Sequence, residues 1–360
     1  MAAQHRPTDD NGGLDAGDRL WERLSASHLL DDLRFPWEVA AAVELGEHAS
    51  QRRFFRLRPA QVGKPASTVL VLYPLGADDE VQHYRRAAAW MCDAGVRVPQ
   101  IYAWGARALL VEDGGDRHLA DASLEASRRQ RCYLRAIDEI LAIQRHGQRA
   151  ESPNPGWALD ARRLRDELEY TERYALSDWL GASGGRHARA RGYERLVEAI
   201  CRLPTAICHR DFHARNLMVA DDSVLVLDYQ DAMIGPQLYD LASLLWDNYC
   251  EVPQDCQQQA LRHYWARVDP VGLVASEVAD VPSVPTGLPA AARQAFCLVA
   301  LQRHLKALGT FAYQIIKYHR HSYARSTGPT WRHARRALQT LGWGDLLAAL
   351  RPLDRLIESA

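Results

Sequence analysis

Residues 208–245 read CHRDFHARNLMVADDSVLVLDYQDAMIGPQLYDLASLL, and this stretch determines how the rest of the chain is interpreted. A His-Arg-Asp tripeptide ends at Asp211, an asparagine follows at Asn216, and an apolar Val-Leu-Val-Leu run leads to Asp228. A short apolar run between polar residues is typical of a buried strand. We therefore expect a strand over 224–227 that brings Asp228 close to the loop carrying Asp211 and Asn216.

Three oxygen-bearing side chains in this order indicate phosphoryl transfer. Moving the terminal phosphoryl group of ATP requires a carboxylate that orients the attacking hydroxyl and accepts its proton, together with oxygen ligands for Mg²⁺. In the pattern H-R-D-x-x-x-x-N the aspartate is the base and the asparagine is a metal ligand. The sequence therefore predicts Asp211 as the catalytic base and Asn216 and Asp228 as ligands of Mg²⁺, with ATP as co-substrate.

The residues after Asp228 argue against a protein kinase. Protein kinases carry Asp-Phe-Gly here, whereas this chain has Asp-Tyr-Gln-Asp, followed by Gly235-Pro236 and Tyr239-Asp240. The whole block resembles the aminoglycoside phosphotransferase-like family of small-molecule kinases, and within it the bacterial N-acetylmuramate/N-acetylglucosamine anomeric kinases. This resemblance implies an α+β, bilobal protein-kinase-like fold, with a small, mainly β N-lobe and a larger, mainly α C-lobe.

The resemblance also assigns roles around the catalytic loop. Asp240 is expected at the start of a helix beneath the loop, where it would bond the loop backbone, with His209 and Arg210 as further structural support. His213 would either approach the transferred phosphoryl group or brace the loop. The candidates for the floor of the acceptor pocket directly follow the metal ligand: Tyr229, Gln230 and Asp231. Asp231 would alternatively brace the loop.

The bulk composition excludes several classes of partner. The 360 residues include 44 Lys+Arg and 45 Asp+Glu, which gives a formal charge of -1. This balance does not favour binding to nucleic acid or to an anionic membrane surface. Seven cysteines at irregular spacings, without a C-x-x-C pair, favour free thiols in a reducing compartment over a disulfide framework or a zinc site. No signal peptide or membrane span is recognisable, which predicts a cytoplasmic protein. The oligomeric state is left open.

The chain is expected to comprise a disordered leader over 1–18, an N-lobe over 19–114 and a C-lobe over 115–360. In the N-lobe we expect an amphipathic helix over 19–33, strands over 37–43, 54–57, 68–73, 101–104 and 108–112, and a helix over 78–94. In the C-lobe we expect helices over 124–144, 162–180, 193–201, 254–268, 290–318, 330–340 and 345–357, with a Pro- and Val-rich connector over 271–288.

The N-lobe lacks two features of the usual nucleotide site. No G-x-G-x-x-G occurs, and the third strand ends at Tyr73 where a lysine would be expected. By resemblance to the anomeric kinases, the backbone around Ser50 and the guanidinium of Arg52 or Arg53 would take part of the phosphate charge. The alternative is a solvated hairpin tip in which these arginines are structural.

Two further segments carry functional expectations. An apolar strand that ends in Glu112-Asp-Gly114 is typical of an interlobe hinge, where main-chain groups near Glu112 and Gly114 would pair with adenine; the alternative is an ordinary turn. The helix over 290–318 carries Arg303 among Gln302 and Lys306, and the resemblance brings this polar side under the acceptor pocket. Alternatively it is an exposed basic edge.

We therefore expect an ATP-dependent phosphotransferase that acts on a sugar hydroxyl. The resemblance implies the anomeric C1 hydroxyl of N-acetylmuramate or N-acetylglucosamine, in peptidoglycan recycling. A kinase for an aminoglycoside, a choline-like amine or another small alcohol is an alternative within the same class. A nucleotide-binding pseudokinase is an alternative outside it, because the third strand has no lysine.

Overall fold

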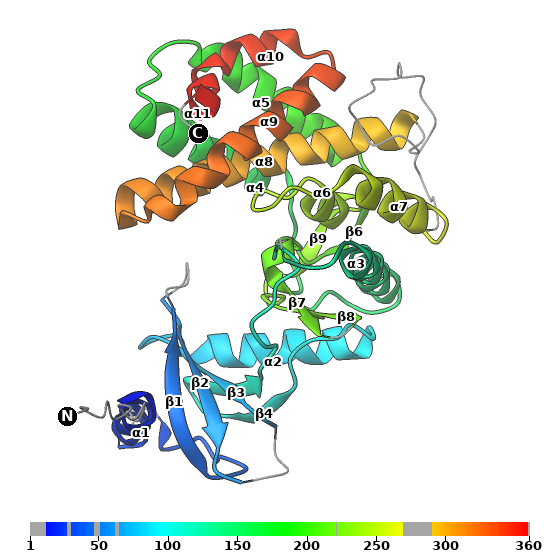
Figure 1. Ribbon diagram of the computed structural model, residues 1–360. Coiled ribbons are helices and arrows are strands. Elements are labelled where there is room, and N and C mark those ends of the chain that lie inside the picture. The colour runs from blue at the N-terminus through cyan, green and yellow to red at the C-terminus, as the bar shows by residue number, and fades with distance from the viewer. Residues whose placement is uncertain are drawn as a thin grey trace, which may run out of the picture. The chain divides into compact units, whose positions relative to one another are not determined.

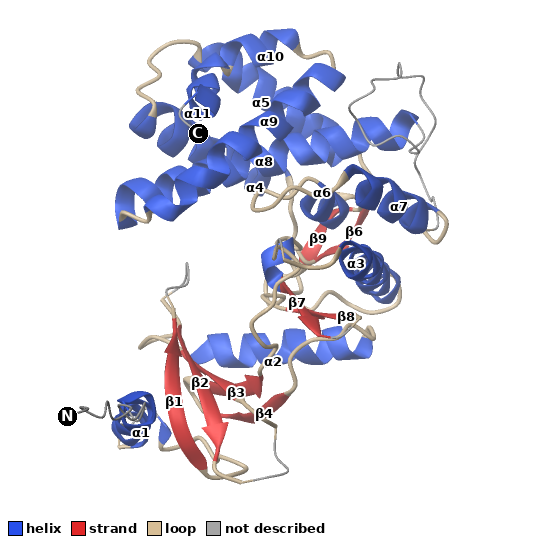
Figure 2. Ribbon diagram, viewed as in Figure 1, coloured by secondary structure: helices blue, strands red, loops and turns tan. Residues whose placement is uncertain are grey.

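The computed structural model describes residues 12–26, 30–46, 51–61, 65–121, 123–220, 222–268 and 290–358. The chain divides into two compact units, formed by Met1–Ala88 with Pro99–Gly114 and by Ala89–Val98 with Gly115–Ala360. The strands of the first unit and the helices of the second are distinguished in Figure 2.

The first unit is built on an antiparallel sheet with the strand order β1-β2-β3-β5-β4 (Figure 1). Its elements are α1 (Gly12–Ser25), β1 (Val39–Leu45), β2 (Arg53–Pro59), β3 (Thr68–Leu72), the first part of α2 (Asp78–Asp93), β4 (Ile101–Trp104) and β5 (Ala108–Glu112). Alternate residues of β2, Phe55 and Leu57, are fully buried and pack with Leu24 of α1 in one hydrophobic cluster. The period-2 pattern of β2 therefore gives the sheet one apolar face.

The second unit is mainly helical. Its elements are α3 (Ala126–Gly147), α4 (Ala161–Tyr170), a π-helix (Thr171–Trp179), α5 (Arg186–Cys201), β6 (Thr205–Cys208), a 3₁₀ turn (Ala214–Asn216), β7 (Leu217–Ala220), β8 (Ser223–Val226), β9 (Met233–Pro236), α6 (Tyr239–Leu245), α7 (Gln254–Trp265), α8 (Ala290–Tyr318), a 3₁₀ turn (His321–Tyr323), α9 (Ala324–Thr340), α10 (Gly344–Ala349), a 3₁₀ turn (Arg351–Asp354) and α11 (Arg355–Glu358). Two short antiparallel pairs, β6 with β9 and β7 with β8, hold the chain on either side of the expected catalytic loop. Helix α8 packs against α9, the π-helix, α4 and α6, so it is the central helix of this unit (Figure 1).

Several boundaries differ from the sequence-based expectations. Helix α1 begins at Gly12, inside the segment expected to be a disordered leader, and ends at Ser25 rather than at residue 33. The helix expected over 162–180 is α-helical only to Tyr170 and continues as a π-helix, in which Leu180 N–H bonds the Ala175 carbonyl. Periodicity of apolar residues does not separate the two helix types, because both bury one side.

Three further parts of the chain differ from the expectations. Helix α9 begins at Ala324 rather than at residue 330 and contains Pro329; packing against α8 compensates the lost backbone bond. The expected C-terminal helix is interrupted by a 3₁₀ turn at Pro352. Strands β6, β7 and β9, each of four residues, were not expected from the sequence.

Some expectations lie outside the described residues, namely those for residues 1–11 of the leader, for Ser50 and for the connector over 271–288. All seven cysteines are free thiols. Within the described ranges, no helix combines the length and the apolar character that a membrane span requires.

A buried ion pair joins the π-helix to α5. Arg189, whose side chain is 1% exposed, donates to both carboxylate oxygens of Glu172 at 2.7 and 2.6 Å and also to the carbonyl oxygens of Gly184 and Ala349. Burying two charges is costly, and the pair is tolerated because nearly every donor has an acceptor. Loss of one partner would leave the other charge in the interior.

We expect Arg189→Met to lower the free energy of unfolding by about 3–5 kcal/mol, because Glu172 then loses its partner. The measurement is urea denaturation followed by circular dichroism. Arg186→Met is the matched control, since its pair with Glu169 spans 3.6 Å between side chains that are 71% and 67% exposed; its loss should cost less than about 1 kcal/mol. Equal costs for the two variants would contradict this account.

Candidate active site

The loop that follows β6 is held from below by the carboxylate of Asp240. Its two oxygens accept the backbone N–H groups of His209 and Arg210 at 2.7 and 3.0 Å. Asp240 is 1% exposed and is the second residue of α6, at the start of a helix as the sequence analysis expected. Burial raises the pKa of Asp240, and the two backbone donors favour its charged form. The ring of His209 adds a contact from Nε2 to the Leu227 carbonyl at 2.9 Å.

A second carboxylate braces the same loop and was not identified from the sequence. Asp247 accepts the backbone N–H groups of Ala214 and Tyr249, both at 2.7 Å, and is 1% exposed. It lies two residues beyond the end of α6, so helix periodicity gives no signal for it in the sequence.

Asn216 and Asp228 are brought together by the β7–β8 pair. Leu227 N–H donates to the Asn216 carbonyl at 2.8 Å, which places Asp228 next to Asn216. The Asn216 amide nitrogen donates to the Asp211 carbonyl at 2.9 Å, so its amide oxygen is the atom left for a cation. Gln230 donates to one oxygen of Asp228 at 3.0 Å. The three predicted residues therefore meet in one place.

The oxygen donors of Asn216 and Asp228 fit Mg²⁺, which completes its coordination with water and substrate, better than they fit a metal whose ligands all come from the protein. Among the described residues, no group of three or more His, Cys, Asp and Glu side chains is arranged to hold a metal. Mg²⁺ typically takes one or two carboxylates and completes its shell with water and substrate phosphates. One amide oxygen from Asn216 and one carboxylate from Asp228 match that pattern.

Two residues of the site have left-handed backbone conformations, which are unfavourable for any residue other than glycine. Arg210 has φ 78° and Asp228 has φ 59°. Such conformations cost on the order of 1–3 kcal/mol each and persist only where the surroundings enforce them. At Arg210 the enforcement comes from Asp240, which holds the backbone N–H in place.

The carboxylate of Asp211 is partly exposed and lies among positive charges. The ammonium group of Lys306, on α8, is 3.5 Å from Asp211 Oδ1, and the two side chains are 23% and 35% exposed. Burial raises the pKa of Asp211, but the charges of Lys306 and Arg210 outweigh this effect and hold it well below its usual value. Asp211 is therefore ionised and able to accept a proton from a bound hydroxyl.

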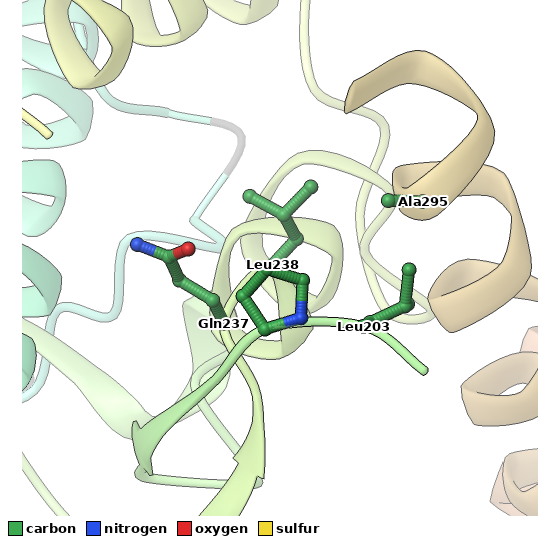
Figure 3. A pocket seen from close by; sticks show the side chains of 5 residues that line it. Leu203, Gln237, Leu238 and Ala295 are labelled. Carbon is green, nitrogen blue, oxygen red and sulfur yellow. The ribbon is translucent and has the colours of Figure 1, made fainter. Parts of the chain in front are cut away.

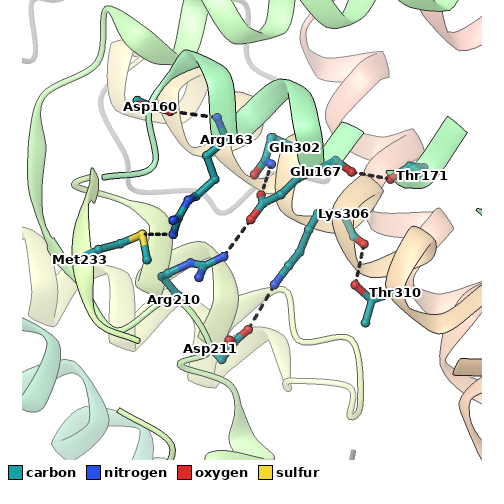
Figure 4. Close-up of polar contacts among 10 residues, drawn as sticks. All are labelled: Asp160, Arg163, Glu167, Thr171, Arg210, Asp211, Met233, Gln302, Lys306 and Thr310. Atoms are coloured by element: carbon teal, nitrogen blue, oxygen red, sulfur yellow. Dashed lines mark hydrogen bonds and ion pairs between the residues drawn. The ribbon is translucent and has the colours of Figure 1, made fainter. Parts of the chain in front are cut away.

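The position of Lys306 depends on how α8 packs on α4 and the π-helix (Figure 4). Glu167 of α4 accepts from Arg210 at 2.8 Å and from Gln302 at 2.7 Å, and so joins the catalytic loop to α8. Thr171 donates its hydroxyl to the Leu305 carbonyl at 2.6 Å. Glu167 was not assigned to the site from the sequence, and Lys306 was placed only on the polar side of its helix, because both positions depend on the packing of distant helices.

Arg303 was expected near the acceptor, but the structure places it in the interior. It is 4% exposed, and its Nε and Nη1 atoms have no hydrogen-bond partner among the described residues. Its charge acts on the carboxyl groups of Asp211, Asp240 and Asp247, which places it beneath the catalytic loop. Helix α8 is buried on this side, so the alternative of an exposed basic edge is wrong for Arg303, while its expected contact with the acceptor stays a prediction.

The other acceptor candidates have different surroundings. Tyr229 is fully buried, so the sequence-based suggestion that it lines the pocket floor does not fit the structure. Gln230 and Asp231 are half-buried, and Asn154 holds the backbone here through the Gln230 carbonyl. Burial lowers the pKa of His213 to about 3, so this imidazole is neutral; its ring lies edge-on to Tyr249.

The residues expected to bind nucleotide lie in the first unit, apart from Ser50, which is outside the described residues. Arg53 pairs with Glu44 at 2.8 Å in an exposed bridge, and Arg52 lies over the rings of Phe54 and Tyr73. The Glu112 N–H is already donated to the Gln100 carbonyl at 2.8 Å. An adenine contact at this point would therefore depend on the Glu112 carbonyl and on Gly114.

A small hollow elsewhere in the second unit is apolar (Figure 3). It is lined by Leu203, Pro204, Gln237, Leu238 and Ala295. No titratable side chain lines it, so the chemistry belongs to the loop around Asp211.

The architecture and the sequence can now be compared with known proteins. A sequence profile of the phosphotransferase enzyme family matches residues 41–273, more than half of the chain. The chain belongs to the phosphotransferase enzyme family. It is therefore a small-molecule kinase, as the motif predicted.

Within the family, the chain is similar in sequence to two kinases that share one name. The N-acetylmuramate/N-acetylglucosamine kinase of Pseudomonas aeruginosa is 31% identical over 278 residues, which cover 76% of this chain and 76% of the relative. The protein of the same name from Pseudomonas putida is 29% identical over 269 residues, covering 73% and 74%.

Solved structures confirm the protein-kinase-like fold class. A choline/ethanolamine kinase family protein from Mesorhizobium loti has a TM-score of 0.55 at 14% identity and covers 93% of this chain and 98% of its own. The amicoumacin kinase hAmiN, in complex with AMP-PNP, Ca²⁺ and Ami, has a TM-score of 0.57 at 13% identity, covering 89% and 92%. At these identities the likeness establishes the fold.

Gly309 sets the approach of α8 to the π-helix. A Cβ atom at this position would lie 2.8 Å from both the Cα and the backbone nitrogen of Thr171, so one helix would have to move. We expect Gly309→Ala to cost about 1–3 kcal/mol of stability through overpacking and to lower turnover, because Lys306 lies on the same helix. Thermal unfolding and turnover are the measurements.

Gly344→Ala is the matched control, because nothing lies within 4 Å of a Cβ there. Its stability should change by no more than about 0.5 kcal/mol. A Gly309→Ala variant that matches the control in both measurements would contradict the proposed role of this contact.

Proposed function

We propose that the protein is a sugar kinase that transfers the γ-phosphoryl group of ATP to the anomeric C1 hydroxyl of N-acetylmuramate, N-acetylglucosamine or both. The observation that carries the proposal is the convergence of Asp211, Asn216 and Asp228 around one loop. The names of the Pseudomonas relatives, at 31% and 29% identity, support these two sugars as acceptors.

Asp211 performs the proton chemistry in this proposal. Its carboxylate holds the acceptor hydroxyl in line with the γ-phosphorus and accepts the hydroxyl proton. As the new bond forms between the acceptor oxygen and phosphorus, the bond from phosphorus to the β,γ-bridging oxygen breaks, and ADP leaves. Because the transition state is loose, the proton moves late and a weak base is sufficient.

The metal-binding step belongs to Asn216 and Asp228. Bound Mg²⁺ would neutralise the charge that develops on the phosphates. Asn216 contributes its amide oxygen and Asp228 its carboxylate, while Gln230 fixes the orientation of that carboxylate. Asp240 and Asp247 keep the loop in the conformation that presents Asp211.

The acceptor is tested with the full chain and Mg-ATP on N-acetylmuramate, N-acetylglucosamine, glucose, an aminoglycoside and choline. We expect turnover with the two N-acetyl sugars, and a ³¹P NMR signal coupled to the anomeric proton. Phosphorylation at C6, or turnover with the aminoglycoside or choline alone, would replace this assignment with that of another small-molecule kinase.

Asp211→Asn should reduce kcat by about 10²–10⁴-fold, because the amide accepts no proton. The control is Asp222→Asn, a carboxylate that is 63% exposed and pairs with Arg131 at 3.2 Å, away from the loop; its kcat should match the unchanged enzyme. Removal of divalent cations with EDTA should abolish turnover, and Mg²⁺ should restore it. If Asp211→Asn retains full turnover, Asp211 is not the base.

A further inference from the structure

The neighbourhood of Asp211 contains one ammonium group that the proposed mechanism does not yet use. Lys306 Nζ lies 3.5 Å from Asp211 Oδ1, and the Lys306 side chain is 23% exposed. It reaches the base from α8, 95 residues further along the chain. Figure 4 shows the side chain extending from α8 toward Asp211.

The other cationic groups near Asp211 are already engaged or inaccessible. Arg210 is paired with Glu167 at 2.8 Å, and its side chain is 14% exposed. Arg303 is 4% exposed beneath the loop. The ring of His213 is engaged edge-on with the ring of Tyr249. Among the described residues around this carboxylate, Lys306 is the cation that a bound reactant can reach.

The ion pair is a poor explanation of Lys306 as a stabilising residue. Partly exposed pairs contribute about 0–1 kcal/mol to folding, and the 3.5 Å separation is long for a charge-assisted hydrogen bond. Three lysines occur among 44 basic residues, so a chain that otherwise uses arginine has a lysine beside the base. An ammonium group is compact and its three donors are free to rotate, unlike the planar fork of arginine.

The transition state supplies a reason for a cation at this point. A loose phosphoryl transfer spreads negative charge over the equatorial oxygens of the transferred group. The carboxylate of Asp211 repels that charge while it holds the acceptor oxygen. An ammonium group 3.5 Å from Asp211 offsets this repulsion.

We propose that Lys306 is a catalytic residue, which contacts the phosphoryl group during its transfer to the acceptor oxygen held by Asp211. The proposal rests on the proposed role of Asp211 as the base, and it holds for either sugar. The position of Lys306 is set by the packing of α8. Thr171 donates to the Leu305 carbonyl, Gln302 donates to Glu167, and Gly309 permits the close approach of α8 to the π-helix. Thr310 donates to the Lys306 carbonyl at 3.1 Å.

The test compares Lys306→Met and Lys306→Arg in the full chain, with Mg-ATP and each N-acetyl sugar. We expect Lys306→Met to lower kcat by about 10²–10³-fold, the cost of removing one group that stabilises transition-state charge. The KM values for ATP and for both sugars should change by no more than about threefold. Lys306→Arg restores the charge in a different shape, and should recover part of the lost kcat.

Lys317→Met is the matched control, because Lys317 is exposed near the end of the same helix; its kcat and KM should not change. Thermal unfolding of Lys306→Met should remain close to that of the unchanged protein. A kcat within twofold for Lys306→Met would overturn the proposal. The proposal would also be overturned if Lys306→Met raised KM for N-acetylmuramate alone and left kcat unchanged. Lys306 would then bind the carboxylate of the acceptor rather than the transferred phosphoryl group.

The outcome remains distinguishable from a failure of the proposed function. If neither sugar is phosphorylated, the comparison is made with the acceptor found by the screen, or with slow ATP transfer to water, where Lys306→Met should again lose kcat. If Asp211→Asn is inactive while Lys306→Met is fully active, the role of Asp211 stands and that of Lys306 is rejected.

Discussion

The site depends on hydrogen bonds that the loop backbone donates to two buried carboxylates. Asp240 holds the residues before Asp211, and Asp247 holds Ala214 after it. A buried carboxylate is costly unless its oxygens accept strong donors, and here the loop backbone supplies them. The strained conformation at Arg210 is therefore maintained by α6, and the base is presented in one conformation rather than several.

Helix α8 provides the second constraint. It meets the catalytic loop through Glu167 and delivers Lys306 to the base, while Arg303 lies buried beneath the same loop. Because Arg303 and Lys306 lie three residues apart on one helix, their relative positions follow from helix geometry. A shift of α8 would therefore change the charge around Asp211 as a unit. This coupling explains why a helix far along the chain bears on the chemistry.

Much of the reacting constellation was predictable from the sequence because its members are local. Asp211, Asn216 and Asp228 lie within one short segment, and the β7–β8 pair needs no distant partner to bring them together. The kinase-like fold class followed from that segment and its resemblance to a family, and the comparisons confirm it. Asp247 was not predictable in this way, because it lies beyond the end of α6 and its bond to the Ala214 N–H is a tertiary contact.

The sequence by itself predicted the chemistry, namely a candidate base, two candidate oxygen ligands and the order in which the chain presents them. The tertiary structure alone decided which cations surround the base, because helix periodicity indicates that α8 has a buried side without specifying its neighbours. It placed Arg303 in the interior and Lys306 beside Asp211, although the two lie three residues apart. The physical reason is that the rotation of α8 about its axis is set by contacts such as Gly309 against Thr171, which join segments distant in sequence.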